Sequence, residues 1–227
     1  MADHMGSQGV LGLTLAVVAL VATACSNGDD DSASIDTVSP SSSETVPHPT
    51  TPAPCKENRH LAVFDINGTL TADEQGTINW LNNPAAEPTP KTGAADLVSA
   101  YADHGYEIMY VTALPTNTKL AGQPAGDALR GWLERHGFPA APGSVNTAGS
   151  TRATELSGEL IGLIGQGVKV DVAYTNNKDD VVAFQTAGVG KIFGLGEAGT
   201  VAGSTKVANN DLAALVPGIT AERRICS

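Results

Sequence analysis

The sequence predicts an α/β fold with a parallel sheet and flanking helices. Short apolar runs of strand length alternate along the chain with segments whose apolar residues recur at helical spacing. Glycines stand just after several of the helical segments, where helices commonly stop. The first apolar run, 61–64, ends at the carboxylate of Asp65. Strands that alternate with helices of this size are typical of parallel sheets.

The individual elements follow from the same patterns. The expected strands are residues 61–64, 107–112, 143–147, 169–174 and 191–195. The expected helices are residues 93–104, 126–136, 151–165, 180–187 and 211–215. In the first helix, for example, Leu97, Val98 and Tyr101 fall on one face, and Gly105 follows as a stop signal.

Three segments between these elements are predicted to be loops. Residues 71–92 are rich in Asn, Pro and Glu and are expected to form a loop with at most a short helical turn. Residues 114–124 are polar, and residues 196–210 are rich in glycine and polar residues. We therefore expect no regular element in the last two segments.

Composition limits the classes of partner. The 227 residues carry a net charge of −11, which disfavours nucleic acid because phosphate contacts need basic patches. A phosphate ligand bridged by a cation remains compatible with this charge. We expect one domain over residues 58–227, present as a monomer.

The N-terminal segment resembles a bacterial lipoprotein signal. Residues 10–24 are apolar and end in the small residues Ala22, Thr23 and Ala24, directly before Cys25. The length suits a signal peptide better than a membrane span. We predict a signal over 1–25, lipidation of Cys25 and export to the extracytoplasmic face of the cell membrane. The leader has no Lys or Arg, so an uncleaved anchor or plain secretion is the alternative.

Residues 26–57 are predicted to be a disordered tether. They are rich in Ser, Thr and Pro and have almost no apolar residues to offset the entropy of ordering. Export would place the chain in an oxidising compartment. Because domain termini are often close together, we predict a disulfide between Cys55 and Cys226, with two free thiols as the alternative.

Polar residues follow three of the predicted strands. Asp65 and Asn67 follow the first, Thr112 ends the second, and Asn176 and Asp180 follow the fourth. The carboxyl ends of parallel strands meet at one edge of the sheet, where ligands bind in open α/β folds. A carboxylate at that edge can attack phosphorus or hold a divalent cation.

Several motifs resemble the haloacid dehalogenase (HAD) superfamily. Within it they are similar to the lipins and to the C-terminal domain of membrane-associated phosphatidylinositol transfer proteins. The motifs are D-I-N-G-T-L-T at 65–71, H-G-Y-E-I-M-Y-V-T-A at 104–113, R-G-W-L at 130–133, Y-T-N-N-K-D-D-V-V-A-F at 174–184 and G-V-G-K-I-F at 188–193. The resemblance covers roughly 61–200 and implies a Rossmann-like HAD fold, with 71–92 as a small flap in place of a cap domain.

The resemblance also implies roles for individual residues. Asp65 would be the nucleophile that forms an aspartyl-phosphate. Mg²⁺ would be held by Asp65, the backbone carbonyl of Asn67, and either Asn176 or Asp180. So few carboxylates fit Mg²⁺, which usually keeps several waters.

Further residues would contact the phosphate and the rest of the substrate. Thr112 would hydrogen-bond a phosphate oxygen, with Gly68 and Ala113 beside it. Arg152 is the candidate for the cation that neutralises the phosphate; the alternative is an ordinary solvated helix charge. Lys169 fits less well because it lies at the strand itself. The family's arginine after Ser-Ala is Leu114 here, so one charged substrate contact is missing.

One position departs from the first motif. The second aspartate, which protonates the leaving group and later activates water, is Asn67 here. We therefore expect an exported phosphohydrolase-type protein that acts on or recognises a phosphomonoester, such as a small molecule or phosphatidate. The alternatives are a catalytically impaired module that binds a phosphate or phospholipid headgroup, and a surface protein with a relic site.

Overall fold

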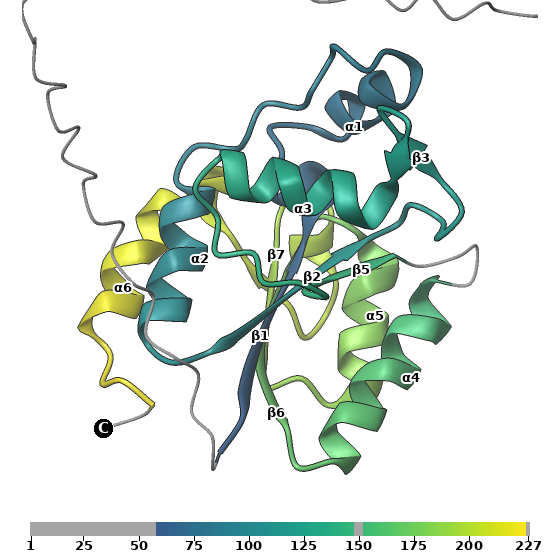
Figure 1. The fold of residues 1–227 in the computed structure, drawn as a ribbon. Helices are drawn as coiled ribbons and strands as arrows, with labels where there is room; N and C mark the ends of the chain where they lie inside the picture. Colours follow the sequence, from purple (N-terminus) through teal and green to yellow (C-terminus); the bar gives the residue numbers. More distant parts are fainter. Residues whose placement is uncertain (1–57, 148–151, 226–227) are drawn as a thin grey trace, which may run out of the picture. The chain divides into compact units, whose positions relative to one another are not determined.

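The computed structural model describes residues 58–147 and 152–225, and these form a parallel sheet with helices on both faces (Figure 1). The sheet order is β5-β2-β1-β6-β7-β8, and every neighbouring pair is parallel. The strands are β1 (His60–Asp65), β2 (Glu107–Thr112), β5 (Val145–Thr147), β6 (Lys169–Thr175), β7 (Lys191–Gly194) and β8 (Thr205–Lys206). The predicted α/β fold class is confirmed.

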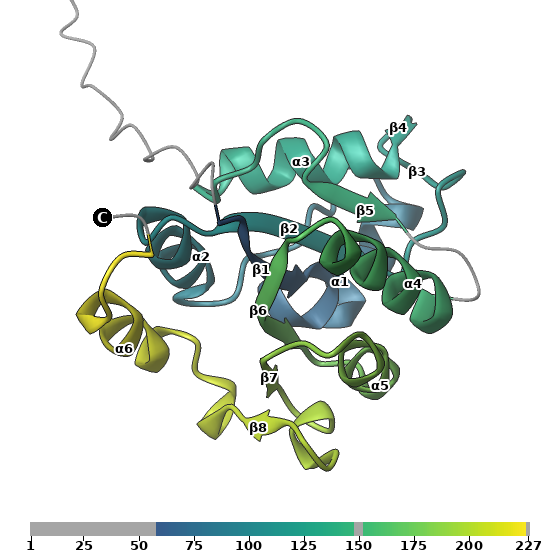
Figure 2. The ribbon, with the colours of Figure 1, turned by 90° about the horizontal axis from the view of Figure 1, so that it is seen from below.

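Alternation along β1 divides the core between the two faces of the sheet. Ala62 and Phe64 point to the face covered by α2 (Ala94–Asp103) and α3 (Ala125–Arg135). Leu61 and Val63 point to the face covered by α4 (Arg152–Gly165) and α5 (Lys178–Ala187). Seen along the sheet, the two helix layers lie on opposite sides of the strands (Figure 2). Both faces of β1 are therefore buried, as expected for the central strand of a parallel sheet.

The face of the sheet covered by α2 and α3 holds a stack of aromatic rings. Phe64 stacks on Tyr174 with ring centres 5.1 Å apart, and Tyr174 stacks on Phe193 at 4.8 Å. The buried hydroxyls of Tyr101 and Tyr174 lie 2.9 Å apart and satisfy one another. This stack joins β1, β6, β7 and α2 directly below the strand ends that bear the polar residues.

The predicted flap contains more structure than expected. Residues 71–92 include α1 (Glu74–Asn82), a nine-residue helix whose N-cap Asp73 accepts a hydrogen bond from Gly76 N at 2.7 Å. Thr77 and Trp80 are its buried positions. The richness in Asn, Pro and Glu favours a loop, but the cap and the burial of Trp80 stabilise a helix.

The base of the flap is closed by backbone hydrogen bonds. Ala72 N donates to Thr89 O at 2.8 Å, and Lys91 N donates to Leu70 O at 2.7 Å. The indole Nε1 of Trp132, in the core of α3, donates to Pro88 O at 2.7 Å. The two arms of the flap are thus tied to each other and to the domain.

Two more of the expected loops contain short strands. Residues 114–124 include the hairpin β3 (Lys119–Leu120) and β4 (Gln123–Pro124), whose turn places Ala121 and Gly122 at positive φ. Residues 196–210 include β8, which pairs with the end of β7. All three strands are two residues long, too short to produce a periodic signal in the sequence.

Two predicted helices have different bounds. The helix expected at 180–187 begins two residues earlier, because the Asn177 side chain caps it by accepting from Asp179 N at 2.8 Å. The helix expected at 211–215 is a single turn, η4 (Ala213–Leu215), that continues into α6 (Val216–Ala221). Pro217 lies in the first turn of α6, where proline is tolerated, and does not end the helix.

The position of Phe64 gives a stability prediction. Phe64→Ala should lower the free energy of unfolding by about 3–5 kcal/mol, because the ring is fully buried between Tyr174 and Tyr101. Val182→Ala, at a side chain that is 53% exposed, is the control and should change it by less than about 0.5 kcal/mol. Urea unfolding followed by circular dichroism measures both. Equal effects would show that the aromatic stack does not stabilise the fold.

Candidate functional site

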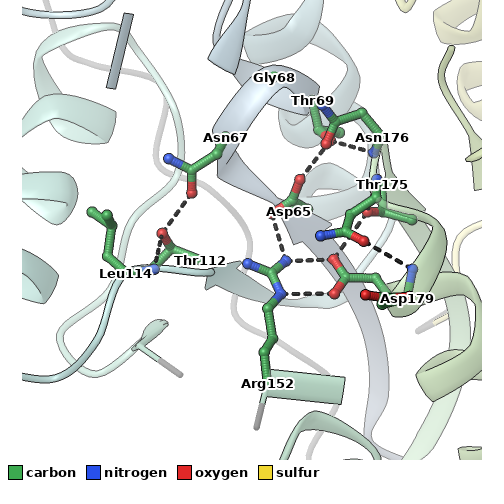
Figure 3. Close-up of polar contacts among 12 residues, drawn as sticks. Asp65, Asn67, Gly68, Thr69, Thr112, Leu114, Arg152, Thr175, Asn176 and Asp179 are labelled. Carbon is green, nitrogen blue, oxygen red and sulfur yellow. Dashed lines mark hydrogen bonds and ion pairs between the residues drawn. The ribbon is translucent and has the colours of Figure 1, made fainter. Parts of the chain in front are cut away.

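The polar residues predicted at three strand ends meet at the carboxyl edge of the sheet (Figure 3). Asp65 ends β1 and is followed by the tight turn η1 (Ile66–Leu70). Thr112 ends the neighbouring β2, and Asn176 follows the other neighbour, β6. Because β1 lies between β2 and β6, Asp65 stands at the centre of the group.

Asp65 is buried and held from two sides. Only 1% of the surface of Asp65 is exposed to solvent. Oδ2 accepts a hydrogen bond from Thr69 Oγ1 at 2.8 Å, and Oδ1 accepts one from Arg152 Nη2 at 2.7 Å. The carboxylate therefore has a fixed orientation at the end of the strand.

Arg152 joins Asp65 to a second buried carboxylate. It is the first residue of α4, and its guanidinium forms a two-pronged ion pair with Asp180 through Nε and Nη2, with Nε donating to Oδ1 at 2.7 Å. Thr175 Oγ1 also donates to Asp180, at 3.0 Å. The planar donors of arginine suit such paired contacts. Arg152 is thus a buried ion-pair partner and not a solvated helix charge.

The protonation of this group reflects burial and charge together. Burial raises the pKa of Asp65 to about 6; Arg152 acts in the opposite direction, and the nearby Asp180 adds to the rise. Burial lowers the pKa of Arg152, but Asp65 and Asp180 together raise it above its usual value. Arg152 is consequently charged at all ordinary pH values.

Asn67 and Thr112 form a second polar contact beside Asp65. Thr112 Oγ1 donates to Asn67 Oδ1 at 2.6 Å and accepts from Leu114 N at 3.2 Å. Thr112 is buried, Asn67 is half-buried, and Ala113 is exposed just beyond the strand end. The Asn67 amide oxygen is thereby occupied as an acceptor, and an amide cannot give up or take a proton as a carboxyl group does.

Asn176 is held by contacts that the sequence did not indicate. Its backbone N donates to Thr69 Oγ1 at 2.8 Å, and its side-chain Nδ2 donates to Glu74 Oε1 on α1 at 3.0 Å. Gly68, at φ +73°, leaves room for this pair above the turn. The motif alone could have suggested Thr69, since it lies within D-I-N-G-T, but Glu74 has no motif signal.

Of the predicted site residues, the structure brings Asp65, Arg152 and Asp180 into one network, which Thr69 extends to Asn176. Asn67 and Thr112 form a separate contact beside it. Lys169, the less favoured cation, begins β6 at the opposite end of the strand and takes no part. Cys25, Cys55 and Cys226 lie outside the described residues, so lipidation and the disulfide stay predictions. Over 58–147 and 152–225, no helix is long and apolar enough to cross a bilayer.

Oxygen donors suited to Mg²⁺ are present beside Asp65. Thr69 Oγ1 lies 2.8 Å from Asp65 Oδ2 and 3.4 Å from Asn176 Oδ1, so the carboxylate and the amide oxygen approach the same point. Both oxygens of Asp180 are engaged by Arg152. Of the two alternatives, Asn176 is therefore better placed than Asp180 to be a ligand. In the part of the chain that is described, no three His, Cys, Asp or Glu residues cluster as a metal site, so any site relies on amide and backbone oxygens.

Comparison with solved structures agrees with this fold. The chain resembles a HAD-like phosphatase from Mesorhizobium loti at 14% identity, covering 80% of this chain and 94% of that one, with a TM-score of 0.51. It also resembles apo phosphoserine phosphatase at 12% identity, covering 70% of this chain and 98% of that one, with a TM-score of 0.47. A search of curated proteins gives no significant match. The likeness to the Mesorhizobium loti structure concerns the fold alone and agrees with the predicted α/β HAD-like fold.

The sequence also matches one particular protein family, which is a smaller group than all proteins with this fold. Residues 62–196, more than half of the chain, match the family described as PITM 1-3, LNS2 domain. The chain belongs to this LNS2 domain family. The resemblance expected from the motifs is thus confirmed.

The buried ion-pair network gives a second stability prediction. Arg152→Met should lower the free energy of unfolding by about 3–5 kcal/mol, because it leaves Asp65 and Asp180 buried without their counter-ion. Arg130→Met, which removes the exposed pair with Glu134, is the control and should cost about 1 kcal/mol or less. Denaturant unfolding of the two variants compares them. If Arg152→Met costs no more than the control, the guanidinium is not what offsets the two buried charges.

Proposed function

We propose that this domain binds a phosphomonoester at the carboxyl edge of the sheet and hydrolyses it slowly, with Asp65 as the nucleophile. The observation that supports this most is the fixed carboxylate of Asp65, buried at the end of β1 and paired with the guanidinium of Arg152. A carboxylate held in one orientation is suited to attack phosphorus, and the adjacent cation suits a phosphate ligand.

In this proposal an oxygen of Asp65 attacks phosphorus, and the substrate's alcohol oxygen leaves with the electron pair of the broken P–O bond. Arg152 offsets negative charge beside the transferring group. Thr112 turns its hydroxyl from Asn67 to a phosphate oxygen. Water then attacks the aspartyl-phosphate, which releases phosphate and restores Asp65.

We also propose that Mg²⁺ is held by Asp65, the backbone carbonyl of Asn67 and the side-chain oxygen of Asn176. The close approach of the Asp65 and Asn176 oxygens to Thr69 supports this set. When bound, the cation would neutralise negative charge on the phosphate. The oxygen donors and the small number of carboxylates fit its preferences.

A second candidate function is a binding module without useful turnover. Asn67 stands where a general acid would protonate the leaving oxygen, and its amide oxygen accepts from Thr112. Loss of general acid–base catalysis typically lowers a rate about 10²–10⁴-fold. On this alternative the domain recognises a phosphorylated headgroup, such as that of phosphatidate, and releases it unchanged.

Restoring the carboxylate separates the two functions. Asn67→Asp should raise phosphate release about 10²–10⁴-fold over the wild type, because it supplies the missing acid. Phosphate release from phosphatidate and from an aryl phosphate, with and without Mg²⁺, measures this. Activity in the wild type supports a slow enzyme, whereas activity only in Asn67→Asp supports the binding module.

Asp65→Asn is the matched control and should abolish release in both the wild-type and the Asn67→Asp backgrounds. Mass spectrometry of each sample controls for deamidation of the Asn67-Gly68 bond, which would create an aspartate in the wild type. Release that persists in Asp65→Asn would overturn the role of Asp65 as nucleophile. Absence of both phosphate binding and release in every variant would leave a relic site.

We further propose that the protein is an exported lipoprotein, anchored through Cys25 at the extracytoplasmic face of the membrane and acting there as a monomer. Residues 10–24 and the small residues before Cys25 support the signal, and the polar composition of 26–57 supports a tether. Such an anchor would hold the site near lipid headgroups. A disulfide between Cys55 and Cys226 would suit the oxidising compartment.

The anchor can be tested directly. Cys25→Ala should reduce the share of the protein in the membrane fraction, because no acyl chains can then be attached. The protein should appear instead in the soluble fraction, either processed or with its signal segment uncleaved. Fractionation with immunoblotting measures the distribution, and non-reducing peptide mapping of the same samples tests the Cys55–Cys226 bond. Unchanged membrane association of Cys25→Ala would favour an uncleaved anchor.

A further inference from the structure

The flap reaches the candidate site through one side chain. Glu74, the first residue of α1, accepts a hydrogen bond from Asn176 Nδ2 at 3.0 Å, although the two residues are 102 positions apart. Helix α1 also contacts the turn η1 that follows Asp65. No motif marks Glu74, and the reaction proposed above gives it no task.

The contact selects one orientation of the Asn176 amide. An amide has a donor end and an acceptor end, so a partner at one end decides which way the other faces. With Nδ2 directed to Glu74, Oδ1 lies 3.4 Å from Thr69 Oγ1, which is itself 2.8 Å from Asp65 Oδ2. The acceptor oxygen therefore lies beside the hydroxyl of Thr69, which also contacts Asp65, and it is the end of the amide that can bind a cation.

Close packing makes the contact specific. Gly68 lies beneath it, and a Cβ at Gly68 would lie 2.8 Å from Glu74 Cγ and would collide with the Asn176 amide. Because Gly68 has no side chain, Glu74 and Asn176 can meet in the space beside it. The backbone N of Asn176 is fixed separately by Thr69, so the amide end is the part left for Glu74 to orient.

We propose that Glu74 is a positioning residue that directs the oxygen of Asn176 toward Asp65, so that the flap helix forms part of the cation site. The inference rests on the Mg²⁺ site proposed above. Partners that orient a ligand commonly change metal affinity about 10- to 100-fold when they are removed. Glu74 is solvent-exposed, which places the expected effect at the lower end of that range.

The first experiment measures Mg²⁺ binding to the full chain by isothermal titration calorimetry, without substrate. Glu74→Ala should raise the Kd for Mg²⁺ about tenfold, and Glu74→Gln, whose amide can pair with either end of Asn176, should raise it less. Gln75→Ala is the matched control, since Gln75 is the next residue and hydrogen-bonds Asn79 on the same helix. It should leave the Kd unchanged.

The second experiment separates orientation from simple attraction between Glu74 and the cation. In the Asn176→Asp background both ends of the side chain are oxygens, so no orientation has to be chosen. There Glu74→Ala should leave Mg²⁺ binding unchanged or strengthen it, because it removes a repelling neighbour. Equal weakening in both backgrounds would show that Glu74 acts by charge alone and would overturn the proposal.

Two possible results distinguish a failure of the Glu74 proposal from a failure of the proposed Mg²⁺ site. If the wild type binds Mg²⁺ and Glu74→Ala binds it equally well, only the role of Glu74 is wrong. If the wild type binds no Mg²⁺, the proposed cation site itself is wrong and the inference falls with it. In metal-free protein, Glu74→Ala should also shift the ¹⁵N-NMR signal of the Asn176 side-chain amide, while Gln75→Ala should not.

Discussion

The ion pairs of Arg152 are the interaction on which the carboxyl edge of this sheet depends. Two carboxylates, Asp65 and Asp180, are buried within reach of one guanidinium. Two like charges in a region of low polarity would repel each other and lose their hydration, which a single well-placed cation offsets. The network also ties the end of β1 to the first residue of α4 and to the first turn of α5. The geometry of the candidate site and the local stability thus rely on the same side chain.

Much of this arrangement could be predicted from the sequence, because the topology of a parallel sheet determines which residues lie together. Once the strands are parallel, residues that follow β1, β2 and β6 must lie at one edge, so Asp65, Thr112 and Asn176 were correctly grouped. The role of Arg152 could not be derived in the same way. A charge in the first turn of a helix has the same sequence pattern whether it faces solvent or two buried carboxylates.

The elements that were predicted poorly share a physical cause. In α1, local capping by Asp73 adds to the burial of Trp80, and that burial depends on tertiary packing. The helix predicted at 211–215 extends to Ala221, and Pro217, in the first turn of α6, does not end it. Glu74 was missed because its partner lies 102 residues away. Local sequence describes propensity well, but it does not contain such distant contacts.

The hydrogen-bonded base of the flap affects where related domains could differ in sequence and length. The arms of the flap are joined by hydrogen bonds between Ala72 and Thr89 and between Lys91 and Leu70, and Trp132 fastens one arm to the core. Beyond this junction Glu74 at the start of α1 still contacts Asn176, but the chain after α1 lies farther along the flap. Extra chain could be inserted at the tip, between α1 and Pro88, without displacing Asp65 or its neighbours. The junction would then allow the surface above the candidate site to vary while the carboxyl edge of the sheet keeps its shape.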